Sequence, residues 1–171
     1  MKNTNKLFLL ILAFILVLSA LLLACGKRKE GAPDGSTITF NPASHSQSGI
    51  AAPTCATFDV TVRYSDGTPM PNAIVTIYGP FAEPRNTANA NARYQFFAYG
   101  NCDLNPGGNI PVDSGFQVQT NDSGIYTFSA NIFDIVTQTT PTGTLTAPNV
   151  FSDTIEAHSG QAFGSAAIEV Q

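Results

Sequence analysis

The sequence predicts an all-β protein, an antiparallel β-sandwich of about seven to eight short strands behind an N-terminal signal or anchor helix. In several short stretches apolar and polar residues alternate with a period of two, and clusters of Gly, Pro, Asp and Asn separate these stretches. The sequence after residue 24 has no helical period. A chain of 171 residues has room for one such domain around a single core.

The first half of the predicted domain contributes three strands. Residues 37–40 form a short strand, and a Ser-rich loop leads from it to Pro53. In the second strand apolar residues alternate with polar ones, Phe58, Val60, Val62 and Tyr64 against Asp59, Thr61 and Arg63. The turn cluster 65–69 follows, and the third strand, 73–78, is apolar on both faces.

The middle of the chain, 79–115, is predicted to be a long irregular insertion in the domain. It contains four prolines, a polar Asn/Ala stretch and the pair Gly107-Gly108. Within it, residues 94–99 (YQFFAY) are rich enough in aromatic side chains to form a strand.

The C-terminal part contributes the remaining strands. Residues 116–120 and 126–132 flank the turn 121–124, so we expect them to form a β-hairpin, which 134–136 extends. A Thr/Pro-rich connection, 137–149, then leads to two last strands, at 151–157 and 166–170.

Residues 1–24 have the pattern of a secretory signal. Two lysines lie within the first six residues, and positions 7–24 are apolar except for Ser19. The sequence Leu22-Leu23-Ala24-Cys25 resembles the lipobox of bacterial lipoproteins. This resemblance implies that the Cys25 thiol is diacylated and that the chain is cut before it, which leaves 147 of the 171 residues (171 − 24). The acyl chains would hold the protein at a membrane.

An uncleaved membrane helix is the alternative, because an eighteen-residue segment that is apolar except for Ser19 is at the lower limit for crossing a bilayer. Both interpretations place the rest of the chain outside the cytoplasm. Residues 25–36 are expected to be a flexible tether, with Lys27, Arg28 and Lys29 beside lipid headgroups. Gly26 after the cysteine resembles the signal for release to the outer membrane in a cell that has one.

The charge of the body excludes nucleic acid as a partner. From Gly31 onward three arginines stand against eleven acidic residues, a net charge of −8. Binding to phosphates requires clustered Lys and Arg, which this part of the chain lacks.

Three segments are similar to the group one bacterial Ig-like domain of the invasin and intimin type. They are residues 60–77, with the Asp66-Gly67 turn and a Pro-rich bend, the turn and strand 120–128, and residues 153–157 (DTIEA). The similarity covers about residues 56–171 and departs from the family in the insertion. It implies that residues 37–171 form an immunoglobulin-like sandwich that serves as a spacer or adhesive module and has no catalytic residues.

Two cysteines remain once Cys25 is set aside, Cys55 and Cys102. In an exported domain two thiols most often pair, because the compartment is oxidising. Such a bridge would tie the start of the second strand to the long insertion. Two separate free thiols are the alternative.

The sequence predicts no metal site. It has no Cys-x-x-Cys pair, and His45 and His158 stand alone in Ser/Gly surroundings, as solvated loop residues. Four acids cluster near turns, and calcium binding by them stays an open alternative to simple turn geometry: Asp66, Asp113, Asp122 and Asp153.

The functional prediction is a non-enzymatic, membrane-anchored envelope lipoprotein that binds a protein or a glycan. No Gly-x-Ser-x-Gly motif occurs, and a similarity to the β-core of intradiol dioxygenases lacks their histidine pair. Four aromatic residues are the predicted contact surface, with packing in the core as their alternative role: Tyr94, Phe96, Phe97 and Tyr99. The second hypothesis is a small-ligand or redox-related envelope protein that uses the 79–115 loop for binding, and free thiols at Cys55 and Cys102 would favour it.

Overall fold

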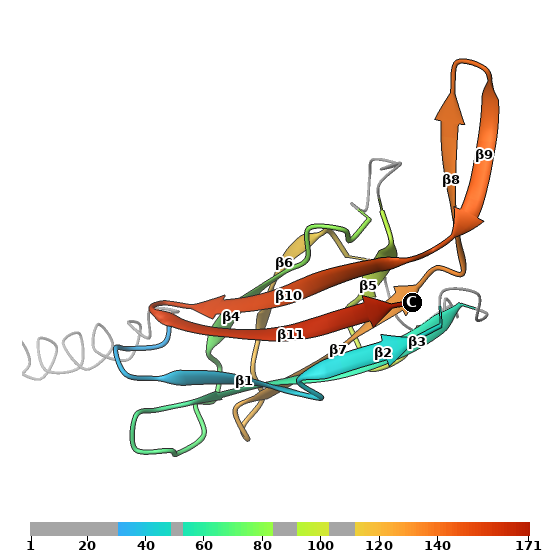
Figure 1. The fold of residues 1–171 in the computed structure, drawn as a ribbon. Helices are drawn as coiled ribbons and strands as arrows, with labels where there is room; N and C mark the ends of the chain where they lie inside the picture. The colour runs from blue at the N-terminus through green and yellow to red at the C-terminus, as the bar shows by residue number, and fades with distance from the viewer. Residues whose placement is uncertain (1–30, 49–52, 84–91, 103–111) are drawn as a thin grey trace, which may run out of the picture. The chain divides into compact units, whose positions relative to one another are not determined.

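The computed structural model describes residues 31–48, 53–83, 92–102 and 112–171. These residues form two β-sheets whose inner faces share one hydrophobic core, together with a separate two-stranded hairpin (Figure 1). The described part contains no helix. The predicted all-β sandwich is therefore confirmed, whereas the predictions for residues 1–30 lie outside the described residues.

The first sheet has four antiparallel strands in the order β1-β3-β7-β5, namely Thr37–Asn41, Thr54–Arg63, Ile125–Ile132 and Tyr94–Phe97. The second sheet has five strands in the order β2-β11-β10-β4-β6, namely Ser44–Gln47, Ala162–Val170, Phe151–Ser159, Ile74–Tyr78 and Gly115–Gln119. Neighbours in the second sheet are antiparallel except β2, which runs parallel to β11. The chain thus enters the first sheet with β1 and crosses to the second with β2.

The hairpin predicted from residues 116–120 and 126–132 is wrong. β6 pairs with β4, whereas β7 pairs with β3 and β5, so the turn between β6 and β7 carries the chain from one sheet to the other. The local turn chemistry is as predicted, because the side chain of Asn121 accepts hydrogen bonds from the backbone N–H groups of Ser123 and Ile125. Turn chemistry alone does not determine which strands pair.

The Thr/Pro-rich segment predicted as a connection is a second correction. It folds into the hairpin of β8 (Ile135–Thr140) and β9 (Gly143–Pro148). Threonine is β-branched and favours strands, although its polar side chain makes a Thr-rich segment resemble a loop. With this hairpin and β2, the described residues contain eleven strands rather than seven or eight.

Aromatic rings fill the centre of the sandwich. The Phe128 ring stacks on Phe58, with ring centroids 5.5 Å apart, and meets the edges of Phe40, Phe96 and Phe116. Phe58 and Phe128 are cross-strand partners on β3 and β7, so the predicted alternation on the Phe58 strand places these rings inward. Aliphatic side chains from both sheets complete the core.

Two turn glycines with positive φ differ in how closely the neighbouring backbone approaches them. A Cβ on Gly124 (φ 73°) would lie 2.6 Å from the carbonyl oxygen of Val62 and 2.8 Å from the backbone nitrogen of Met70. A Cβ on Gly67 (φ 83°) would meet nothing within 4 Å. We expect Gly124→Ala to lower the free energy of unfolding by about 2–3 kcal/mol, and Gly67→Ala by about 1 kcal/mol. Urea titrations of both variants check this, and equal losses would contradict the close backbone contact.

Candidate functional site

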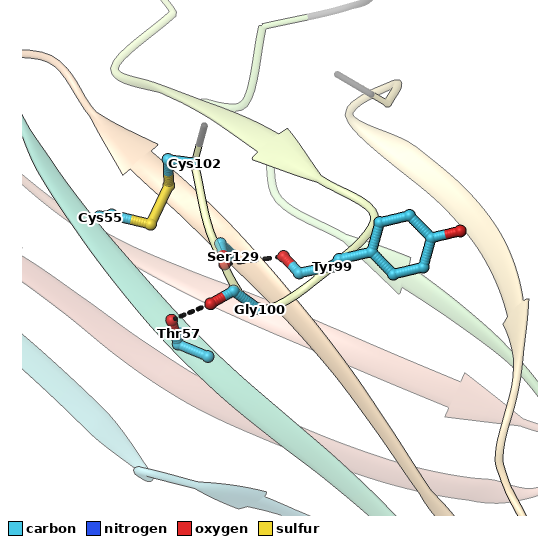
Figure 2. Close-up of a disulfide and its surroundings, with 6 residues drawn as sticks. All are labelled: Cys55, Thr57, Tyr99, Gly100, Cys102 and Ser129. Atoms are coloured by element: carbon cyan, nitrogen blue, oxygen red, sulfur yellow. Dashed lines mark hydrogen bonds between the residues drawn. A yellow bond between two sulfur atoms is a disulfide. The ribbon is translucent and has the colours of Figure 1, made fainter. Parts of the chain in front are cut away.

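The segment after β5, residues 98–102, lies on the outer face of the four-stranded sheet (Figure 2). A disulfide joins Cys102 to Cys55 at the start of β3, with an S–S distance of 2.14 Å. This cross-linked segment also accepts hydrogen bonds from the sheet, at the Gly100 carbonyl from Thr57 (3.1 Å) and at the Tyr99 carbonyl from Ser129 (2.8 Å). The predicted Cys55–Cys102 pair is confirmed.

The disulfide leaves no thiol at either position for chemistry. Cys55 is solvent-exposed and Cys102 is partly buried, so the bridge is on the surface of the domain. Free thiols at Cys55 and Cys102 would have favoured the second hypothesis, a small-ligand or redox-related protein that uses the 79–115 loop. Because both cysteines are in the disulfide, neither sulfur is available as a thiolate nucleophile.

Three of the four aromatic residues predicted as a contact surface are buried, namely Tyr94, Phe96 and Phe97. For these three the contact prediction is wrong, and they have the alternative role of packing inside the domain. Tyr94 and Phe96 point from β5 into the shared core, and Phe97 is only 3% exposed. β5 lies beside the inner strand β7, so its alternate side chains face the second sheet. Tyr99 is 61% exposed and its ring points away from the disulfide (Figure 2).

Asp153 has a role that the turn interpretation missed. It lies within β10 at an inward position, only 8% exposed, and its carboxylate accepts a hydrogen bond from the Tyr94 hydroxyl (2.5 Å). The backbone N–H groups of Phe81 and Thr154 also donate to it, at 3.3 Å and 2.7 Å. The signal was in the sequence, because Asp153 shares its alternation with the buried residues Ile155 and Ala157.

The four acids considered for calcium are not brought together. Asp66 is exposed and binds its own turn, because the Thr68 hydroxyl and backbone N–H donate to it and lower its pKa. The Asp153 carboxylate accepts the hydrogen bonds from Tyr94, Phe81 and Thr154 described above. Within the described ranges no three His, Cys, Asp or Glu side chains lie close enough to hold a metal ion.

The outer face of the five-stranded sheet carries the exposed aromatic residues that sequence analysis overlooked. Tyr78 on β4 is 44% exposed and Phe163 on β11 is 52% exposed. Between them on β10, Glu156 pairs with Tyr78 and His158 with Phe163 in the sheet register. His158 contacts Glu156 (Nε2–Oε2 3.1 Å) and its ring lies 4.9 Å from the Phe163 ring. We call these four residues the aromatic face.

Both histidines lie in strands rather than in the predicted loops. His158 belongs to β10, and His45 lies in β2, where its Nε2 is 3.0 Å from the side-chain oxygen of Gln47. Tyr78 and Glu156 lie in the predicted strands 73–78 and 151–157, whereas His158 and Phe163 lie beyond the predicted strand bounds, in β10 and β11. The pairings of Tyr78 with Glu156 and of His158 with Phe163 cannot be recognised until the strand register is known.

Two tyrosine hydroxyl groups should make the stability of the fold depend on pH at alkaline pH. Burial, and then the hydrogen bond to Asp153, raise the pKa of Tyr94 above its ordinary value, and burial raises the pKa of Tyr126 to about 12. A raised pKa keeps its full stabilisation below the unfolded value of about 10 and loses it as pH rises further. We expect the melting temperature to be level from pH 8 to about pH 10 and then to fall. Thermal melts across this range check it, and Tyr94→Phe should fall less steeply than the parent.

Comparison with known proteins returned no match, either to a family model or among curated proteins. In the part of the chain that the structure describes, there is no helix with the length and hydropathy of a membrane span. The lipid anchor at Cys25 lies outside the described residues and remains a prediction.

Proposed function

We propose that this protein is a non-enzymatic envelope lipoprotein, an immunoglobulin-like module that Cys25 anchors to the outer side of a membrane and that binds a protein or glycan. The observation that carries the proposal is the aromatic face, a solvent-exposed sheet surface with two aromatic rings and a Glu–His pair. Residues 25–36 would act as the tether between lipid and sandwich.

The strand order supports the immunoglobulin-like assignment. In that fold one sheet has the order A-B-E-D and the other contains C, F and G. Here β1-β3-β7-β5 correspond to the first sheet, and β4, β10 and β11 to the second. The departure lies in the order along the chain. β5, which corresponds to strand D, comes before β6, the additional strand beside β4. The disulfide also differs from the antibody pattern, because it joins β3 to the segment after β5 rather than to β10.

The composition of the aromatic face suits contact rather than catalysis. Exposed aromatic side chains supply large contact area at small entropic cost, and they dominate binding energy at interfaces. Glu156 and His158 lie between the two rings and offer hydrogen-bond acceptors and a donor. Tyr78 and Phe163 can pack against an apolar surface, such as the C–H face of a sugar ring. Glu156 and His158 can then form hydrogen bonds with the hydroxyl groups of the sugar.

The test uses the full-length lipoprotein in liposomes, applied to a glycan array and to immobilised envelope polysaccharide and protein fractions. We expect Tyr78→Ala/Phe163→Ala to weaken binding at least tenfold, about 1.4 kcal/mol or more. Tyr64→Ala is the matched control, since Tyr64 is an exposed tyrosine outside the aromatic face. Equal binding by both variants, or no binding by the parent, would contradict the proposal.

A further inference from the structure

The first described residues pack against the turn between β10 and β11. The buried backbone N–H of Ala32 donates a hydrogen bond to the Ser159 hydroxyl (2.9 Å), and Ala32 is only 3% exposed. Gly160 in this turn has a φ of 57°, and a Cβ there would collide with the Ala32 carbonyl oxygen. Residues 31–36 of the predicted tether therefore belong to the sandwich, whereas 25–30 lie outside the described residues.

This contact limits the distance between the sandwich and the predicted lipid anchor. Six residues lead from Cys25 to Gly31 (31 − 25), and an extended chain spans at most about 3.6 Å per residue. The β10–β11 turn therefore lies within about 22 Å of the anchor. The hairpin β8–β9 joins β10 at its other end (Figure 1), about 27 Å from the turn, because β10 has nine residues.

The aromatic face lies at the end of the sandwich that contains this turn. Phe163 is the second residue of β11, and its register partner His158 directly precedes Ser159. Tyr78 pairs with Glu156, three residues before the end of β10, so it lies about 10 Å from the turn. The whole aromatic face is thus within roughly 32 Å of the anchor.

The charges on and around the aromatic face favour a neutral ligand. From Gly31 onward the chain has a net charge of −8, and the face contains Glu156 but no Lys or Arg. Phosphate-bearing headgroups are anionic, so this surface repels them. Sugar rings offer C–H faces for the two aromatic rings and hydroxyl groups for the Glu–His pair. A sugar without phosphate fits both properties.

We propose that the aromatic face binds the neutral sugar headgroup of a lipid in the membrane that holds Cys25. The short link keeps the face close to the headgroup layer of that membrane. Binding is then effectively intramolecular, so that a weak interaction with each sugar is sufficient. This inference rests on the proposed function, and it narrows the partner from a protein or glycan to a lipid-borne sugar.

The placement can be measured with a single introduced tryptophan, because the chain contains none. The full-length lipoprotein is reconstituted in phosphatidylcholine vesicles that contain a dansyl-labelled lipid. We expect energy transfer to the dansyl group to be about threefold more efficient from Phe163→Trp than from Leu145→Trp, which lies in the hairpin. Equal transfer, or stronger transfer from Leu145→Trp, would contradict the placement.

The same tryptophan tests the ligand, with digalactosyl diacylglycerol as the probe. We expect acrylamide quenching of Phe163→Trp to fall about twofold when this neutral glycolipid shares the protein's vesicles, and to stay unchanged with anionic phosphatidylglycerol. Adding Tyr78→Ala should remove the protection, whereas adding Tyr64→Ala, outside the aromatic face, should retain it. No protection by the glycolipid, or equal protection by phosphatidylglycerol, would overturn the proposal.

Glycolipid placed in separate vesicles distinguishes this inference from the proposed function. The inference predicts little protection of the tryptophan and no clustering of the two kinds of vesicle by light scattering. Clustering would overturn the same-membrane ligand, while glycan binding by the aromatic face would stand. If the protein also failed to bind every glycan and protein fraction, the proposed function itself would fail.

Discussion

Replacing Cys55 and Cys102 together by serine is expected to lower the free energy of unfolding by about 4 kcal/mol. The disulfide closes a loop with a sequence separation of 47 residues, and its loss restores conformational freedom to the unfolded chain. For a domain of this size the melting temperature should fall by roughly 10 °C. Differential scanning calorimetry of the oxidised parent and the double variant measures both quantities.

The control separates the covalent bond from the hydrogen bonds beside it. Ser129→Ala removes only the hydrogen bond to the Tyr99 carbonyl, and we expect it to cost about 1 kcal/mol. If the double variant lost no more than Ser129→Ala, the hydrogen bonds alone would hold the cross-linked segment. The account of the disulfide as the main restraint would then be wrong.

Asp153→Ala is expected to lower the free energy of unfolding by about 3–4 kcal/mol. The substitution leaves the buried Tyr94 hydroxyl and the Phe81 N–H without the acceptor to which both donate. Tyr94→Phe removes one donor, leaves the carboxylate with two N–H partners, and should cost about 1–2 kcal/mol. Urea unfolding of the two variants and the parent gives the order.

Asp66→Ala is the matched control for Asp153. Both residues were predicted as turn acids, but Asp66 is exposed and bonds only within its turn. Its replacement should therefore change stability far less than that of Asp153. Losses of equal size would contradict the assignment of Asp153 to the core. Added calcium should leave the melting temperature of the parent unchanged, and an increase would revive the calcium alternative.

The strands could be predicted because their signal is local. Alternation at Phe58, Val60 and Val62 states which side of β3 is buried, and the structure agrees at all three. The pairing of strands is not local. The turn after β6 has the same Asn and Gly chemistry whether the next strand returns to the same sheet or crosses to the other, and here it crosses.

The site was harder to predict than the fold for the same reason. Aromatic density at 94–99 cannot distinguish a contact surface from a core strand, and the neighbour β7 decides that Tyr94 and Phe96 are buried. Tyr78 and Phe163 are 85 residues apart in the sequence, and only the order β4-β10-β11 brings them to one face. The disulfide was predictable because, with Cys25 set aside, only two cysteines remained to pair.

Intact-mass spectrometry of the membrane-extracted protein, alkylated with and without prior reduction, tests the central claim most directly. The account predicts a chain that begins at an acylated Cys25, with no alkylation before reduction and two alkylated thiols after it. An uncleaved leader would contradict the lipoprotein anchor. Alkylation of Cys55 and Cys102 without reduction would contradict the disulfide-stabilised contact module and restore the case for thiol chemistry.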